Sequence, residues 1–226
     1  EFTLGIATQA LAEMVLEQNA TPSVAIAFDS RNNSKALSNK IADVLSANGV
    51  KVYIYENLRP TPQLSFTIRH FGCDAGIVVT ASHNPPEYNG YKVYGNDGCQ
   101  IVSPQDKDLV SRVRNTTYSS IKFERNDDLV EYLREEADLL YFNAINTLTV
   151  RPDVVKAQTD LPIVYTGLHG TGAVSTKLAL NAWGFNNIIE VPEQSIPDGN
   201  FPTVDSPNPE EPAALKMALE LADKVN

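Results

Sequence analysis

The feature that most constrains the fold is the alternation of helical and extended patterns in the first third of the chain. Apolar residues recur at helical spacing in 35-KALSNKIADVLSANG-49, after a similar pattern at the start of the chain. Short runs rich in β-branched residues alternate with these segments: 24-VAIAF-28, 50-VKVYIY-55 and 76-GIVVT-80. Short buried strands that alternate with helices are typical of a mostly parallel sheet with helices on both faces. We therefore expect an α/β protein made of three-layer α/β/α domains with mixed, mostly parallel sheets.

The patterns that follow extend this alternation. They predict, in order, a helix over residues 62–71, a hairpin formed by 91–95 and 100–102 around the turn 96-NDG-98, a helix from Pro104 and a long helix over 128–148. A further α/β segment is then predicted, with a strand at 163-IVYT-166, a helix through Trp183, a strand over 187–191 and a last helix over 210–225.

A domain boundary is expected where 125-RNDDL-129 interrupts the apolar patterning. The predicted domains are residues 1–128, nearly complete, and residues 129–226. The second domain shows only about two strands, and the sequence ends on a helix where a βαβ unit needs one more strand. We therefore expect the second domain to be truncated and the chain to be a fragment of a longer protein.

Composition excludes several classes of protein. The formal net charge is −10, and the 18 Lys and Arg residues form no basic stripe, so a nucleic-acid binder is not expected. No apolar run approaches the roughly 18 residues of a membrane helix, and the start lacks a signal-peptide pattern. We expect a cytoplasmic protein without a membrane partner, in which Cys73 and Cys99 are free thiols and hold no zinc.

The strand predicted at 76–80 ends abruptly at Ser82, His83 and Asn84, which two prolines follow. Ligands of open parallel sheets bind beyond the carboxyl ends of strands, so this loop lies where a site is expected. The prolines restrict the backbone and stiffen the loop, and a serine hydroxyl held there could serve as a nucleophile or phosphoryl acceptor. The alternative is that Ser82 and Asn84 only satisfy backbone groups in a turn.

The sequence does not support a serine hydrolase site or a phosphate-binding P-loop. A serine hydrolase is not expected, because G-x-S-x-G is absent and the side chains of consecutive residues such as Ser82 and His83 do not normally meet. The glycine-rich 167-GLHGTG-172, which contains His169, lacks the ending of a phosphate-binding P-loop. We interpret it as a tight turn between a strand and a helix.

The run 80-TASHNPPEYNGYKVYGNDG-98 resembles the phosphoserine loop of the α-D-phosphohexomutase superfamily, and is most similar to its phosphoglucomutase and phosphopentomutase branch. The segment 28-FDSRNNS-34 resembles the family's Asp-x-Arg turn, and 58-LRPTPQLSF-66 supports the resemblance. Two later segments, 161-LPIVYTGLHGTGAV-174 and the stretch over 197–215, resemble the family more loosely but in the same order. The resemblance covers the first predicted domain nearly throughout.

This resemblance implies a mutase that moves a phosphoryl group between the C1 and C6 oxygens of a hexose phosphate through a phosphorylated Ser82. Glucose 1,6-bisphosphate is the implied intermediate and activator. His83 is implied to handle protons beside the phosphoserine, Lys92 to act as general acid/base and charge partner, and Arg31 and Asn84 to bind phosphate. Without the resemblance, Lys92 would be the solvent-facing residue of a strand and Arg31 a surface turn residue.

The resemblance also implies one Mg²⁺ ion per full-length active site, bound by Ser82 through its phosphate and by an Asp-x-Asp-x-Asp loop. That triplet is absent from this sequence. We therefore expect the missing C-terminal domains to be required, and the chain alone to be inactive. For the full-length protein we expect a phosphoglucomutase of carbohydrate metabolism. The alternatives are a phosphopentomutase, a phosphomannomutase or a non-catalytic sugar-phosphate-binding α/β module.

Overall fold

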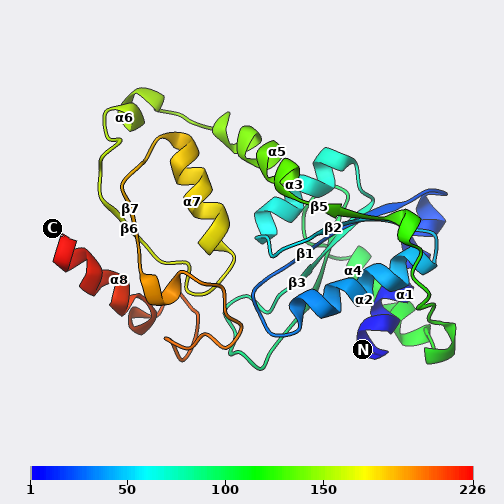
Figure 1. Cartoon of the computed structure of the whole chain (residues 1–226). Coiled ribbons are helices and arrows are strands. Elements are labelled where there is room, and N and C mark those ends of the chain that lie inside the picture. Colours follow the sequence, from blue (N-terminus) through cyan, green and yellow to red (C-terminus); the bar gives the residue numbers. More distant parts are fainter. Residues whose placement is uncertain (1, 226) are drawn as a thin grey trace. The chain divides into compact units, whose positions relative to one another are not determined.

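A five-stranded sheet organises the first half of the structure, a computed structural model that describes residues 2–225. Its strands, in spatial order, are β4 (Tyr91–Gly95), β3 (Ala75–Val79), β1 (Ser23–Phe28), β2 (Lys51–Tyr55) and β5 (Val130–Leu133). Strands β3, β1, β2 and β5 run parallel, and β4 pairs antiparallel with β3. The predicted mixed, mostly parallel sheet is confirmed (Figure 1).

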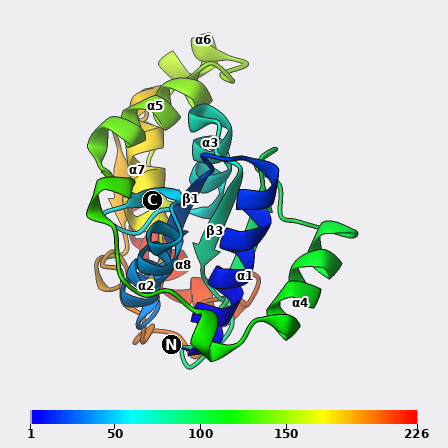
Figure 2. The same cartoon turned by 90° about the vertical axis from the view of Figure 1, so that its right-hand side faces the viewer.

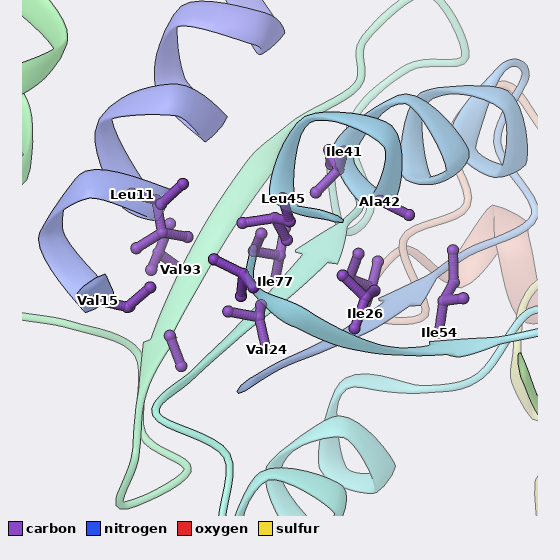
Figure 3. Close-up of a cluster of buried hydrophobic side chains, with 14 of the residues drawn as sticks. Leu11, Val15, Val24, Ile26, Ile41, Ala42, Leu45, Ile54, Ile77 and Val93 are labelled. Carbon is purple, nitrogen blue, oxygen red and sulfur yellow. The ribbon is translucent and has the colours of Figure 1, made fainter. Parts of the chain in front are cut away.

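Helices cover both faces of this sheet because successive side chains of a strand point to opposite faces. On one face, Val24 and Ile26 of β1 belong to an apolar cluster that also includes residues of α1 (Phe2–Gln18), α2 (Ser34–Ala47) and α4 (Gln105–Asn115). Figure 3 shows the members from α1 and α2 against the sheet. On the other face, Ala25 and Ala27 pack with α3 (Thr61–Phe71). Helices α1 and α4 lie side by side (Figure 2). The predicted three-layer α/β/α arrangement is therefore present in this half of the chain.

The chain folds into two compact units, and each unit is made of three separate sequence ranges. The first combines residues 2–29, 33–80 and 90–137, and the second combines residues 30–32, 81–89 and 138–225. The loop that carries Ser82 and the turn that carries Arg31 thus belong to the second unit, although both lie in the first predicted domain. No helix within the described residues is long and apolar enough to cross a membrane.

The second unit contains a parallel pair of strands, β6 (Ile163–Tyr165) and β7 (Ile188–Glu190), connected through α7 (Gly172–Trp183). Helix α8 (Pro212–Val225) packs against β6. The remaining helical elements of the chain are α5 (Glu135–Asn146), α6 (Pro152–Lys156) and the short 3-10 turns η1 (Tyr118–Ser120), η2 (Asp127–Leu129) and η3 (Pro192–Gln194). The strands and long helices predicted after residue 160 are confirmed.

The prediction of one helix over residues 128–148 is wrong. The segment forms η2, then β5, and only then α5. Strand β5 pairs in parallel with β2, and Leu133 lies opposite Tyr55. Residues 130–133 therefore take the free edge of the first sheet, and the first unit continues to Ala137, beyond the boundary placed at residue 128. Tertiary pairing along that edge decides the structure of so short a segment.

The hairpin prediction is correct only for its first strand. Residues 91–95 form β4, but residues 100–102 contribute a single bridge, between Gln100 and Tyr94. β4 instead pairs along its whole length with β3, and Lys92 lies opposite Val78. The edge of the buried strand β3 offers more backbone partners than the short return after the turn.

Candidate active site

The Ser82 loop, residues 81–89, follows β3 directly along the chain and folds into two tight turns. The backbone N–H of Asn84 donates to the carbonyl of Ala81 at 3.1 Å, and that of Tyr88 donates to Pro85 at 3.1 Å. Ser82 has a φ of 58°, in the left-handed region that costs an L-residue roughly 1–2 kcal/mol. Its side chain is exposed. A strained residue with an exposed hydroxyl is typical of a functional loop.

The side chains of Ser82 and His83 approach each other, contrary to expectation. Ser82 Oγ lies 3.3 Å from His83 Nδ1, and the imidazole tautomer decides which atom donates. Successive side chains point apart in an extended backbone, and the left-handed conformation of Ser82 removes this separation. His83 is also exposed, so its ring is open to solvent as well as to the serine oxygen.

Arg31 holds the backbone of the Ser82 loop. Its side chain is buried, with 3% of the residue exposed. Nη1 donates to the carbonyls of Pro85 at 2.9 Å and Tyr88 at 3.1 Å, and Nη2 donates to those of Ser82 at 2.9 Å and Asn84 at 2.5 Å. The guanidinium therefore gathers four carbonyls from one short loop. The alternative of an exposed turn residue is wrong, and the predicted contact of Arg31 with phosphate stays a prediction.

The other predicted site residues are placed as follows. Asn84 is exposed, and its carbonyl is one of the four that accept from Arg31. Lys92 is half-buried on β4, which belongs to the first unit, whereas Ser82, His83, Asn84 and Arg31 belong to the second. The roles assigned to Lys92 and Asn84 by resemblance remain predictions.

Asp29, the aspartate of the Asp-x-Arg turn, was given no role of its own from the sequence, and it fixes the strand ends ahead of the loop. Asp29 follows β1, and its carboxylate accepts from Ser34 Oγ at 2.8 Å and from Thr80 Oγ1 at 2.5 Å. Its backbone N–H donates to the carbonyl of Val79, the last residue of β3, at 3.2 Å. Asp29 therefore joins the end of β1 to the end of β3. Its position directly after a predicted strand was a sequence signal that could have identified it as part of the site.

The turn 167-GLHGTG-172 connects β6 to α7, as predicted. His169 is buried, with 2% exposed, and has a φ of 59°. Its Nδ1 lies 3.0 Å from the Ile196 carbonyl and its Nε2 lies 2.9 Å from Thr203 Oγ1. Since a carbonyl only accepts, Nδ1 donates to Ile196, and Nε2 is hydrogen-bonded to the Thr203 hydroxyl. His169 is thus an internal anchor of the second unit.

A cavity of about 280 Å³ lies beside the start of α8. Its polar lining comes from Thr203, Asp205, Ser206 and Glu211. Ser206 Oγ also donates to the carbonyl of His83 at 3.3 Å, so the segment that lines the cavity contacts the Ser82 loop.

A complete magnesium site is not formed by the described residues. Residues 2–225 contain no group of three or more His, Cys, Asp or Glu side chains that could hold a metal ion. Of the ligands implied by resemblance, the described residues include Ser82 but no carboxylate triplet. The described residues by themselves therefore do not fit the ion.

Comparison with known proteins gives consistent matches in both halves of the chain. A family model described as phosphoglucomutase/phosphomannomutase, alpha/beta/alpha domain I, matches residues 1–120. The model of domain II of the same family matches residues 140–226.

Individual relatives are similar along the whole chain. A probable phosphomannomutase of Haemophilus influenzae is 38% identical over 219 residues, which are 96% of this chain and 44% of that protein. A phosphoglucomutase of Staphylococcus saprophyticus is 35% identical over 232 residues, covering 100% of this chain and 41% of that protein. A crystal structure of a Thermus thermophilus protein assigned as a phosphomannomutase aligns with a TM-score of 0.84 at 25% identity. The alignment covers 98% of this chain and 48% of that one.

The chain therefore spans less than half the length of the relatives that it matches. This coverage agrees with the expectation that the chain is a fragment of a longer protein.

Proposed function

Because this chain belongs to the phosphoglucomutase/phosphomannomutase family, we propose that the full-length protein interconverts glucose 1-phosphate and glucose 6-phosphate through a phosphorylated Ser82. The observation that carries this proposal is the geometry of the Ser82 loop. An exposed serine hydroxyl lies in a strained left-handed conformation, on a loop whose carbonyls are held by one buried arginine. A phosphoryl carrier needs such fixed presentation, since phosphoryl transfer is mainly positioning and charge neutralisation.

The proposed reaction has two transfers of opposite direction. In the first, the bond between Ser82 Oγ and phosphorus breaks while a hydroxyl oxygen of the sugar monophosphate bonds to phosphorus and loses its proton. The resulting 1,6-bisphosphate turns around. In the second transfer, Ser82 Oγ attacks the other phosphate and the sugar oxygen that leaves takes up a proton. No bond is gained or lost over the cycle, and the serine ends phosphorylated again.

In this scheme His83 handles a proton, and Arg31 and Lys92 supply positive charge. His83 Nδ1 lies 3.3 Å from Ser82 Oγ, so the imidazole can hold the proton of the free serine hydroxyl as it attacks. The positive charge of Arg31, hydrogen-bonded to the loop carbonyls, partly offsets the charge of a phosphoryl group on Ser82. We propose that Lys92 supplies a second positive charge and that Mg²⁺ is bound by ligands outside the described residues.

The test uses the full-length protein and intact-mass analysis. The purified protein should carry a phosphate on Ser82, and Ser82→Ala should lose both this phosphate and conversion of glucose 1-phosphate in the presence of glucose 1,6-bisphosphate. Ser119→Ala, which changes an exposed serine elsewhere, should retain both. Full activity of Ser82→Ala would refute the role of the serine. Sugar-phosphate binding without turnover by the wild-type protein would favour a non-catalytic module.

A phosphomannomutase is the second candidate, favoured by the name of the Haemophilus influenzae relative at 38% identity. Ratios of kcat/KM for glucose 1-phosphate, mannose 1-phosphate and ribose 1-phosphate distinguish these activities and phosphopentomutase. The chain of residues 1–226 alone should show no turnover with any of them. Measurable conversion by the chain alone would show that no further domain is required.

A further inference from the structure

The segment over residues 198–206 contacts both the Ser82 loop and the arginine that holds it. We propose that this segment positions Ser82. Its principal contact is the one between the Phe201 ring and the Arg31 guanidinium, which restricts the orientation of the guanidinium. The meaning of this positioning for catalysis rests on the proposed function, while the positioning itself is a property of the folded chain. All the contacts involved lie within the second unit.

The first step of the argument is the contact between Phe201 and Arg31. The centre of the guanidinium lies 5.1 Å from the centroid of the Phe201 ring, within the range of a cation–π interaction. Both residues are buried, with 4% of Phe201 and 3% of Arg31 exposed. The ring therefore restricts the orientation of the guanidinium, whose two terminal nitrogens donate to four carbonyls of the Ser82 loop.

Phe201 reaches this position at a conformational cost. Its φ is 48°, a left-handed conformation that a bulky side chain rarely adopts. The backbone is held there by local hydrogen bonds: Phe201 N donates to Asp198 O at 3.2 Å, and Val204 N donates to Phe201 O at 3.1 Å. Strain of this kind persists where surrounding contacts over-determine it, and it clusters near functional sites.

The segment also approaches the turn of residues 30–32 too closely for any side chain at Gly199. A Cβ atom on Gly199 would overlap the backbone nitrogen of Asn32 and lie 2.9 Å from the carbonyl carbon of Arg31. Beside this approach, Asn32 Nδ2 donates to Asn200 Oδ1 at 2.8 Å. The same turn contacts the loop, since Asn89 Nδ2 donates to Asn32 O at 3.3 Å.

The far end of the segment is attached to the loop and to the interior. Ser206 Oγ donates to the carbonyl of His83, the residue after Ser82. Thr203 Oγ1 lies 2.9 Å from Nε2 of buried His169 and accepts from Gln194 Nε2 at 3.0 Å. The segment is thus anchored in the second unit at Thr203, between its contact with Arg31 and its contact with His83. A fixed segment can in turn fix the position of the loop.

The experiment measures hydrogen exchange in the chain of residues 1–226, with Phe201→Leu as the test variant. Leucine is also apolar and has a similar energetic cost in the left-handed backbone conformation of residue 201, but it lacks the aromatic face. We expect exchange of the Asn84 and Tyr88 amides to become about tenfold faster, a change that corresponds to about 1.4 kcal/mol. Phe201→Tyr should stay within about twofold of wild type. Phe185→Leu, the same change between α7 and β7, should leave the loop unchanged.

A second readout separates positioning from general stability. In the full-length protein, Phe201→Leu should lower kcat for hexose-phosphate conversion about tenfold while KM changes less than about twofold, and Phe201→Tyr should restore kcat. If Phe201→Leu does not fold, Gly199→Ala replaces it, since an added methyl group displaces the segment from Asn32. That variant should also accelerate exchange in residues 81–89.

Two outcomes would overturn the proposal: unchanged exchange in residues 81–89, or an equal acceleration in the loop and in the strands β6 and β7. Hydrogen exchange needs no turnover, so it decides the positioning role even if the wild-type full-length protein proves inactive. In that case the proposed mutase function fails and the contact between the segment and the loop is still tested.

Discussion

Replacing Arg31 by lysine gives the most direct test of how the Ser82 loop is held. Arg31→Lys keeps a positive charge on a long side chain, but lysine offers one nitrogen where arginine offers a planar fork. The two terminal nitrogens of Arg31 serve different pairs of acceptors, Pro85 and Tyr88 for Nη1, and Ser82 and Asn84 for Nη2. A single ammonium cannot serve both pairs with the same geometry, so at least two of the four bonds are lost.

The size of the effect follows from the number of bonds and their surroundings. A hydrogen bond to a charged group contributes about 1.5–3 kcal/mol, so two lost bonds correspond to a gross loss of about 3–6 kcal/mol. Water can solvate the freed carbonyls of this exposed loop, which reduces the net loss to about 3 kcal/mol. Local opening of the loop should then be about 100-fold more frequent, because every 1.4 kcal/mol is a factor of ten.

Hydrogen exchange followed by mass spectrometry measures this opening. The amides of Asn84 and Tyr88 are hydrogen-bonded within the loop and report its opening directly. They should exchange about 100-fold faster in Arg31→Lys than in wild type. The matched control is Arg151→Lys, a change at a residue whose side chain is 69% exposed in the same unit. An unchanged exchange rate in Arg31→Lys would refute the conclusion that the guanidinium holds the loop.

Three further predictions concern residues outside the loop. Cys99 should react with a thiol reagent near pH 8 in the native protein, while Cys73 should react only after unfolding, because burial raises the pKa of the Cys73 thiol to about 11; native labelling of both thiols at similar rates would contradict this. The Arg112 guanidinium, hydrogen-bonded to Glu17, lowers the pKa of that carboxyl. The pair therefore stabilises the fold above the ordinary carboxyl pKa of about 4.3 and loses this effect as pH falls through the lowered value. Glu17→Gln should make the Tm less sensitive to pH between about pH 5 and pH 3, and an unaltered Tm profile would argue against the pair. Finally, His169→Phe keeps a ring but neither hydrogen bond, and should lower the free energy of unfolding in urea by about 2 kcal/mol; a loss below about 0.5 kcal/mol would show that the anchor is not needed.

The sequence predicted the fold class because its strongest signals are local. The buried runs that became β1, β2 and β3 and the amphipathic pattern that became α2 depend on residue spacing alone, and all four appear where expected. Strand β5 was missed because its four residues carry too little periodicity, and its structure comes from pairing with β2. The second arm of the hairpin failed for the related reason that β4 found a better partner in β3.

The sequence pointed to a candidate site, but it did not indicate how that site is held in place. The residues between β3 and β4 carried a resemblance strong enough to single out Ser82, His83 and Asn84, and the turn after β1 pointed to Arg31. Nothing in the spacing indicated that Arg31 would be buried under the loop. Phe201 gave no signal either, because its importance depends on a contact across 170 positions of sequence, from Arg31 to Phe201.

The sequence by itself determined the alternation of helices and strands, the family, and the loop that presents Ser82. Only the tertiary structure decided what holds that loop: the four carbonyls bound by Arg31 and the aromatic ring of Phe201 against its guanidinium. The physical reason is that helix and strand patterns follow from neighbours along the chain. A buried guanidinium instead takes whichever acceptors and aromatic faces the fold brings to it, and these come from segments distant in sequence.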